Sequence, residues 1–459
     1  VVGAVLIHRS NGGGLKITPT TMFLLYYLTF VYIGSALLVW DRGEGAYFHI
    51  AGSRNYVLLA TVGLAPLVFA CGVWLANRWT RFRPDAELTA HWQSGWSDPP
   101  PARAFTLRFV VLTAACVAVS VAVVAFGPTP PLFYLLTHPG SGTLAFDLSL
   151  HDVRLSYLSQ HAGGLPFQAT LYQFYGNIMP LLSIIALAQW LRVRSRRWLL
   201  AGLALLAGSF LMAALTLTKN PVENLLVLLI VAWLWWRHRN LGPWQVSAMA
   251  GVALGAFFTL VVATNRSVPL GNILVSTVRR LFVVQAQVLY SIFDLVPARV
   301  GFLGGGAFWM DVRNLRPGPK STLDFGGWLY TMIVSGGTKL DAGVGSAPTA
   351  FFGQLYADFG VIAALAGMLV VGCLAQLVYV RYLRHGRTVV AWAVFVGLTV
   401  SIPRLTTSSL ISIGVQYGIA ASILLGIYFA DWSDLVRRLR SWRPRRSPQP
   451  VAQPDHGVG

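Results

Sequence analysis

The residues best suited to chemistry in this chain are basic side chains in one long connection between apolar segments. Residues 265–349 contain eight Lys and Arg against four Asp. The alternation of apolar segments places this connection on the outer side of a membrane, where Lys and Arg are usually scarce. Guanidinium groups bind phosphate-type anions through paired hydrogen bonds. The basic excess therefore predicts an anionic ligand at the outer face.

Shorter outer connections add single charged side chains. Arg154 is the only basic residue of 127–167 and fits a surface anchor as well as a ligand contact. Lys219 precedes Glu223 by four residues at the head of a span, a spacing at which the two can pair, although a carboxylate in apolar surroundings also indicates function. Arg404 lies among hydroxyl side chains in the turn Ile402–Ser409, which favours phosphate binding over snorkelling to the interface.

The elements that must position these residues are membrane helices. The chain is 55% hydrophobic and 11% charged, with a mean hydropathy of +0.60, which excludes an ordinary soluble domain. We predict an all-α, polytopic membrane protein with about ten spans, because only helices satisfy their backbone in lipid at these lengths. The predicted spans are Met22–Trp40, Tyr56–Ala76, Phe105–Phe126, Gln168–Leu191, Trp198–Leu217, Pro221–Trp236, Trp244–Thr264, Ala350–Val380, Val389–Ile402 and Leu410–Ala430.

The charges of the connections predict orientation and domains. One side carries 21 Lys and Arg and the other 13, which predicts that both termini are cytoplasmic. The expected units are membrane helices over 1–264, a large extracytoplasmic loop with interfacial helices over 265–349, membrane helices over 350–430, and a basic, Pro-rich, disordered tail over 431–459. Within the loop, Leu281–Ala298 is apolar enough to cross, but its polar residues favour a helix at the outer interface. Gly304–Gly306 is interpreted as a flexible hinge.

Several function classes are disfavoured. The net charge of +19 follows mainly from the cytoplasmic excess of Arg and from attraction to anionic lipid. The basic residues are scattered over short loops without a binding module, so no nucleic-acid partner is expected. The three Cys lie in apolar segments and form no disulfide framework. His151 and His161 match no compact ligand spacing, so no metal is expected.

One stretch resembles a known family. Gly343–Gly372 reads GVGSAPTAFFGQLYADFGVIAALAGMLVVG. This is similar to the signature of Wzy-type O-antigen polymerases, in which Pro-Thr, Gly, an acidic or amide residue and Leu-Tyr precede a Phe-Gly entering an apolar helix. Further islands lie at Arg280–Pro297, Gly304–Gly306 and Leu315–Pro317, and the resemblance covers roughly Gly127–Phe429.

The resemblance implies a GT-C-like membrane glycosyltransferase of the bacterial cytoplasmic membrane. Such enzymes transfer a glycan from one polyprenyl-diphosphate carrier to the sugar of a second, at the extracytoplasmic face, without a metal, a nucleotide sugar or another cofactor. Donor and acceptor oligosaccharides on lipid carriers, membrane lipid and, in some systems, a chain-length regulator protein are the expected partners.

The resemblance and the chemistry together suggest roles for individual residues. A diphosphate gains negative charge as it leaves, and fixed guanidinium groups stabilise that charge. No His is present in 265–349, where the family carries a catalytic one, so the general base stays open among five carboxylates. The expected diphosphate-binding residues are Arg154, Lys219, Arg266, Arg279, Arg280 and Arg404; substrate-binding residues are Arg313, Arg316, Lys320, Tyr356 and Asp358; the favoured bases are Asp311 and Glu223, ahead of Asp324, Asp341 and Asp358.

Two other functions fit the same features. A ligase would move a finished glycan onto another acceptor, and the sequence does not distinguish that acceptor from a growing chain. A lipid-linked glycan transporter would need charged residues near the middle of several spans. Glu223 and Asp358 are nearly the only candidates for such charges and lie near outer ends, which favours the enzyme.

Overall fold

The computed structural model describes residues 7, 16–40, 55–96, 102–127, 129–138, 149–150, 153, 171–217, 219–237, 251, 255, 270–313, 324–334, 347, 349–416 and 418–430. Of these residues 86% are helical and none lies in a strand. The predicted all-α class is therefore confirmed for the described part of the chain.

Eight helical runs in the described residues are long and apolar enough to cross a membrane, consistent with the predicted polytopic protein. Several combine an α-helix with a π-helical or 3-10 segment. They are α2 (Pro19–Tyr26) with η1 (Tyr27–Ile33) and α3 (Gly34–Trp40); α4 (Asn55–Thr80); α6 (Arg103–Phe126); η2 (Gln173–Ile178) with α10 (Met179–Val193); α11 (Arg196–Leu215); α19 (Val361–His385); α20 (Val389–Ser401) with η4 (Ile402–Thr406); and η5 (Ser412–Gln416) with α21 (Ile419–Phe429).

Two of the ten predicted spans are not among these eight. The helix α12 (Lys219–Trp236) is apolar but shorter, with Pro221–Trp236 as its apolar part. The predicted span Trp244–Thr264 lies outside the described residues, apart from Gly251 and Gly255.

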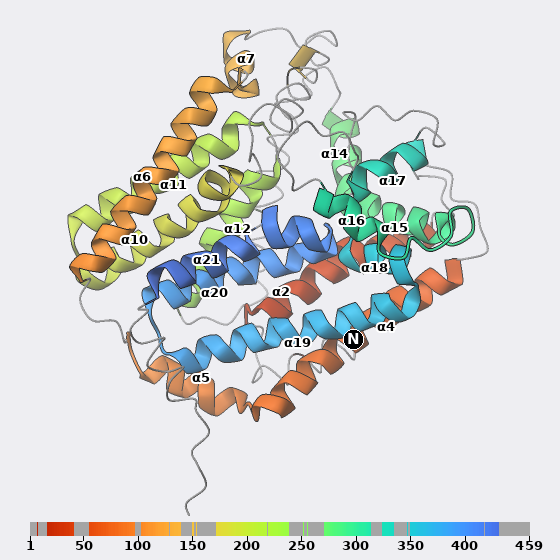
Figure 1. The fold of residues 1–459 in the computed structure, drawn as a ribbon, viewed down its shortest axis with the longest axis horizontal. Helices are drawn as coiled ribbons and strands as arrows, with labels where there is room; N and C mark the ends of the chain where they lie inside the picture. The colour runs from red at the N-terminus through yellow and green to blue at the C-terminus, as the bar shows by residue number, and fades with distance from the viewer. Residues whose placement is uncertain are drawn as a thin grey trace, which may run out of the picture.

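Shorter helices occupy the two ends of the bundle (Figure 1). Arg-bearing connections gather at the end that holds α5, here called the arginine-rich end, and α14 to α18 lie toward the opposite end, here called the loop end. The shorter helices are α5 (Pro84–Gln93), α7 (Pro131–Thr137), α14 (Leu270–Val278), η3 (Arg279–Val283), α15 (Val284–Leu295), α16 (Gly306–Arg313), α17 (Phe325–Val334) and α18 (Phe351–Phe359).

Contacts between distant segments define the arginine-rich end. Arg384 at the end of α19 donates to the Thr80 carbonyl at the end of α4 (2.8 Å) and pairs with Glu87 of α5 (2.6 Å). Arg108 near the start of α6 donates to the Ala430 carbonyl just after α21 (3.1 Å). The ends of four spans that we predicted to be cytoplasmic thus lie at one end of the bundle.

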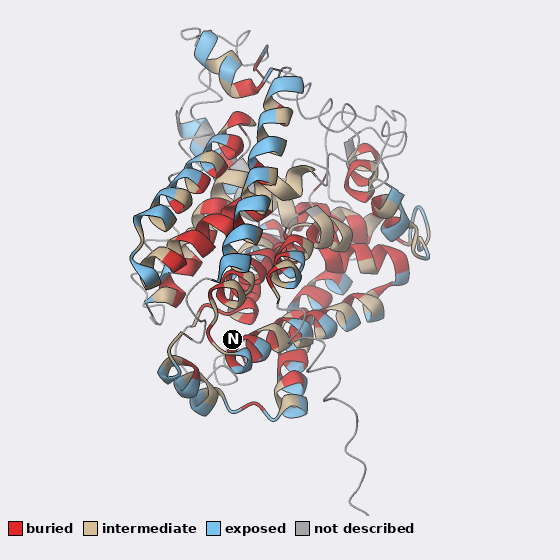
Figure 2. Cartoon of the chain, turned by 60° about the vertical axis from the view of Figure 1, so that its left-hand side comes forward, coloured by how far each residue is buried: buried red, intermediate tan, exposed pale blue. Residues whose placement is uncertain are grey.

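The buried side chains form two large clusters that meet along the last spans. One cluster joins α2, η1, α4, α15, α18 and the first half of α19, and the other joins α6, α10, α11, α12, α20 and α21. The span formed by α20 and η4 is central, since 83% of its apolar window is buried, whereas only 17% of the α6 window is buried. Buried residues face the interior of the bundle and exposed ones its outside (Figure 2).

The predicted span Ala350–Val380 is wrong as a single helix. The chain breaks at Gly360, whose φ of +83° lies in the left-handed region that favours glycine. The break separates the short α18 from the spanning helix α19. The apolar pattern alone did not reveal it, because residues on both sides of Gly360 are hydrophobic.

The segment Leu281–Ala298 also differs from the predicted interfacial helix. It forms the end of η3, α15 and the turn after it, and α15 is buried over most of its length, including Gln287. It packs against α3 and α18. An interfacial helix would keep a polar face in water, so α15 is better described as part of the protein core.

Glycines let α4 and α19 pack closely. A Cβ on Gly372 would overlap the Phe69 carbonyl oxygen, and one on Gly72 would overlap the Leu369 carbonyl oxygen. Small residues at such crossings are typical of membrane helix pairs. We expect Gly372→Val to destabilise the protein by about 1–3 kcal/mol or more. The overlapping atoms belong to the backbone, which cannot move aside as a flexible side chain can. The measurement is the thermal midpoint in detergent.

The matched control for this prediction is Gly63→Ala in α4, where an added Cβ would meet nothing within 4 Å. Its midpoint should equal that of the unmodified protein. Equal midpoints for all three proteins would show that α4 and α19 do not pack through these glycines.

Candidate functional site

A small pocket lies between span ends at the loop end of the bundle; its walls are mainly apolar, and it is here called the polar pocket for the polar side chains that also line it. Its walls come from η2, α10, α11, α12, α20, η4 and α21, and its volume is about 50 Å³. Most of these segments are apolar, so their polar side chains stand out where they meet. The polar residues lining the pocket are Tyr172, Tyr175, Asn177, Ser209, Thr216, Asn224, Ser401, Arg404 and Ser422.

Arg404 supplies the charge of this pocket. It lies in the 3-10 turn η4, which extends the most buried span, and is only 9% exposed. Glu223 lies on α12, which packs against α20, and its carboxylate is within electrostatic range of the Arg404 guanidinium. The structure therefore brings together two residues, Arg404 and Glu223, that the sequence singled out separately.

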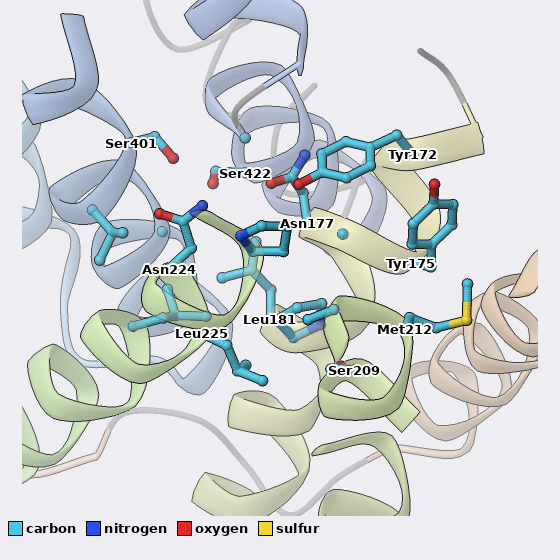
Figure 3. A pocket seen from close by; sticks show the side chains of 18 of the residues that line it. Tyr172, Tyr175, Asn177, Leu181, Ser209, Met212, Asn224, Leu225, Ser401 and Ser422 are labelled. Atoms are coloured by element: carbon cyan, nitrogen blue, oxygen red, sulfur yellow. The ribbon is translucent and has the colours of Figure 1, made fainter. Parts of the chain in front are cut away.

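Asn224, Ser401 and Ser422 lie on one side of the pocket and Tyr175 on the other, and the Asn177 amide lies next to Tyr172 (Figure 3). A Cβ on Gly418 would lie 2.9 Å from Ser401 Oγ and 3.1 Å from Asn177 Oδ1, so these two side chains approach each other across the glycine. The φ of Gly418 is +103°, which also favours glycine at the start of α21.

Hydrogen bonds hold Asn177 in place. Asn177 Nδ2 donates to Gln173 Oε1 (2.9 Å), and Gln173 Nε2 donates to the Val415 carbonyl of η5. The two π-helical segments η2 and η5 are thereby tied together beside the pocket, and π-helical segments are frequent at functional sites. Their wider turns bring Gln173 and Val415 into contact at the point where both spans begin.

Ser422 offers an unused hydroxyl to the pocket. It is 1% exposed, and among the described residues its Oγ has no hydrogen-bond partner. A buried polar atom without a partner is rare in native proteins and usually indicates a water or a ligand. The Ser422 hydroxyl is therefore available to a polar molecule in the pocket.

The close packing behind Ser422 gives a testable prediction. A Cβ on Gly397 of α20 would lie 2.5 Å from Ser422 Oγ and 3.0 Å from Leu181 Cδ2. We expect Gly397→Ala to lower stability by about 1–3 kcal/mol, as overpacking of a core does. Removing the clashing hydroxyl with Ser422→Gly in the same chain should restore most of the thermal midpoint.

A control for this pair is Gly414→Ala in η5, where a Cβ would meet nothing within 4 Å. If Ser422→Gly fails to compensate Gly397→Ala, the two residues do not face each other as described.

Asp311, a predicted base, is buried and connects α16 to α17 and α18 through hydrogen bonds. Its Oδ1 accepts from the Phe325 amide (3.1 Å) and its Oδ2 from Gln354 Nε2 (3.0 Å), and Ser409 adds a side-chain hydrogen bond. Burial raises the pKa of Asp311, against the opposing effect of these hydrogen bonds. Gln354 Oε1 in turn accepts from the Leu410 amide (3.2 Å), which connects α16 and α18 to the turn that follows Arg404.

Asp358 is the acceptor for the start of α16. Its carboxylate accepts from the backbone amides of Gly305 (3.1 Å), Ala307 (2.9 Å) and Phe308 (3.2 Å). Burial raises the pKa of Asp358, and these three amides act in the opposite direction. Gly304–Gly306, interpreted from sequence as a flexible hinge, is thus bound to α18 by hydrogen bonds.

Other predicted site residues are placed as follows. Tyr356 is buried, stacks on Phe293 with ring centroids 3.6 Å apart, and donates to the Val296 carbonyl (3.1 Å), so it is held in the protein core and does not line the pocket. Arg279 on η3 and Arg313 at the end of α16 are exposed and do not line the pocket. Asp324 accepts from the Gly327 amide at the start of α17 (2.6 Å).

The remaining predicted residues cannot be compared with the pocket. Lys219 begins α12 and Arg280 lies in η3, but their side chains are not described. The others lie outside the described residues: Arg154, Arg266, Arg316, Lys320 and Asp341. Of the predicted diphosphate-binding residues whose side chains are described, Arg404 lines the pocket and Arg279 does not. A convergence of the other arginines with Arg404 stays a prediction.

Most of the neutral polar residues of the pocket were not predicted from the sequence. Asn177, Asn224, Ser401 and Ser422 each lie inside or at the edge of an apolar run. Amides within membrane segments are costly unless satisfied by a partner, and that signal could have selected Asn177 and Asn224. A single Ser carries no such signal, because a helix can satisfy it internally.

Comparison of the chain with models of protein families, with curated proteins and with solved structures found no match in any of the three.

Proposed function

We propose that this chain is a membrane glycosyltransferase that polymerises oligosaccharide repeat units carried on polyprenyl diphosphate. The observation that carries the proposal is the buried Arg404 guanidinium in a polar pocket between span ends, with Glu223 in electrostatic range. A buried cation with a carboxylate in electrostatic range and one unused hydroxyl group suits a reaction in which a leaving group takes negative charge away from a sugar. The resemblance of Gly343–Gly372 to Wzy-type polymerases points to the same chemistry.

In the proposed reaction the bond between the donor's anomeric carbon and the diphosphate oxygen breaks, and the electron pair stays with the diphosphate. Arg404 stabilises the charge that develops there. A hydroxyl of the acceptor sugar forms the new carbon–oxygen bond and loses its proton to a carboxylate. Glu223 is the better of the two candidate bases, because both carboxylate oxygens of Asp311 already accept hydrogen bonds from the protein.

The pocket has to open for this reaction. Its volume of about 50 Å³ is well below the roughly 300–1,000 Å³ of small-molecule sites. A diphosphate needs more room, so we propose that it enters as Tyr172 and Tyr175 move aside. These two rings, 5.4 Å apart in an edge-to-face arrangement, then offer faces on which a sugar can stack.

The proposed setting is the bacterial cytoplasmic membrane, with the loop end of the bundle facing outward and both termini inside. This orientation follows from the Arg excess at the other end. Flipped lipid-linked repeat units would reach the pocket laterally from the outer leaflet.

The deciding experiment uses purified protein in detergent or nanodiscs and a chemically defined repeat unit on polyprenyl diphosphate. A ladder of products that differ by one repeat, with release of free polyprenyl diphosphate, is the expected result. Transfer of a preformed glycan to a different acceptor, without a ladder, would instead indicate a ligase. Movement of the substrate across a vesicle membrane without new glycosidic bonds would indicate a transporter and overturn the proposal.

A further inference from the structure

A second, larger cavity lies on the other face of the α20–α21 pair. Its volume is about 630 Å³, within the range of about 300–1,000 Å³ of small-molecule sites. The walls are almost wholly apolar side chains of α19, α20, η4 and α21. Representative residues are Leu374, Val378, Leu398, Ile402, Ile419 and Ile423. We call it the lipid-facing groove, because its walls are spans and its rim residues Leu374 and Ile423 are exposed.

One end of the groove is cationic. Arg381 and Arg384 line it at the arginine-rich end, together with Thr80. Arg384 is held by Glu87, whose two carboxylate oxygens accept from Nε (2.7 Å) and Nη2 (2.6 Å). Arg381 is exposed, and no acidic side chain among the described residues pairs with it. Its charge therefore remains available for a ligand at the groove entrance.

The dimensions of the groove match one leaflet of a bilayer. Along α19 its lining runs from Val371 to Arg384, about 20 Å at 1.5 Å per residue. One leaflet of hydrocarbon is about 15 Å thick, half of the roughly 30 Å core. A molecule whose charged group lies at Arg381 would thus keep its hydrocarbon chain within the groove.

We propose that the lipid-facing groove binds one anionic glycerophospholipid, with an acyl chain along the apolar walls and its phosphate at Arg381. The exposed guanidinium selects a negative headgroup, and the fixed Arg384 reinforces it. Basic pockets between membrane helices at one bilayer face are recognised sites for such headgroups. The site is separate from the polar pocket, so the inference does not depend on the proposed glycosyltransferase activity.

Native mass spectrometry of the delipidated full chain, titrated with phosphatidylglycerol or phosphatidylcholine, tests the headgroup. We expect one phosphatidylglycerol to bind more tightly than phosphatidylcholine. Arg381→Gln should weaken phosphatidylglycerol binding about fivefold, the effect of one basic residue near a membrane surface. Arg197→Gln, an exposed Arg at the start of α11, is the matched control and should change nothing.

A second pair of variants tests the groove itself. Ile423→Trp places a bulky ring in the groove, whereas Leu424→Trp alters the adjacent residue of α21, which does not line it. The first should abolish the bound phosphatidylglycerol and the second should retain it, at equal thermal midpoints. Equal affinity for both phospholipids, an equal loss in Arg197→Gln, or retention by Ile423→Trp would each overturn the proposal. Tighter binding of a neutral lipid or a polyprenyl phosphate than of phosphatidylglycerol would also overturn the proposal.

Discussion

Arg404→Gln is expected to lower the rate of glycan polymerisation by about 10²–10³-fold, the usual effect of removing one preorganised donor to a developing anion. The side chain is buried in the polar pocket, so no solvent cation takes its place. Arg404→Lys keeps the charge but loses the paired hydrogen bonds, and should recover only part of the rate. The measurement is the initial rate of ladder formation by the purified proteins.

The loss of Arg404 also leaves the half-buried Glu223 without its nearby cation, so stability and rate must be separated. The double variant Arg404→Gln with Glu223→Gln removes both charges and should regain the thermal midpoint while staying inactive. Arg237→Gln, at the other end of α12, makes the same change away from the pocket and should retain full rate. Recovery of polymerisation in the double variant would refute the role of Arg404 in diphosphate stabilisation.

Asp358→Ala is expected to destabilise the protein by about 3 kcal/mol or more. The buried Ala307 amide and the partly buried Gly305 and Phe308 amides would lose their acceptor, and a buried donor left unsatisfied costs about 1–3 kcal/mol. Asp358→Asn keeps one acceptor oxygen, so its stability should lie between those of the unmodified protein and Asp358→Ala. Thermal midpoints and denaturant titration in detergent measure the series.

A matched control for Asp358 is Asp294→Ala at the end of α15. Asp294 pairs with Arg299 at 3.3 Å, and the Arg299 side chain is 66% exposed. Such a surface pair contributes at most about 1 kcal/mol. Similar losses in Asp294→Ala and Asp358→Ala would contradict the capping role, whereas a clear difference would support it.

The site was only partly predictable from the sequence, because its residues differ in the signals that they carry. Arg404 and Glu223 are charged residues at the ends of apolar segments, and that alone marks them. Their proximity is a property of the fold, since 181 positions separate them and the packing of α12 against α20 brings them together. Ser401 and Ser422 are uncharged, so the sequence gives no comparable signal for them.

Two carboxylates, those of Asp311 and Asp358, illustrate a different difficulty. From the sequence, Asp311 is an acid in the long connection and Asp358 is an acid near the outer end of a predicted span, and both are therefore candidates for chemistry. In the fold their oxygens accept hydrogen bonds from backbone amides and Gln354, which positions α16 and α18. A sequence records that a carboxylate is present, but only the tertiary structure determines which donors surround it.

Apolar run length by itself determined that this chain forms membrane helices, because a backbone in lipid has no other way to satisfy its hydrogen bonds. The spacing of Arg between those runs likewise determined which connections share one end of the bundle. Tertiary structure alone decided the break at Gly360, the burial of α15, the meeting of Arg404 and Ser422 in one pocket, and the approach of Glu223 to within electrostatic range of Arg404. These features depend on which helix faces meet, and helix contacts in a membrane are selected by shape and small residues, which hydropathy does not record.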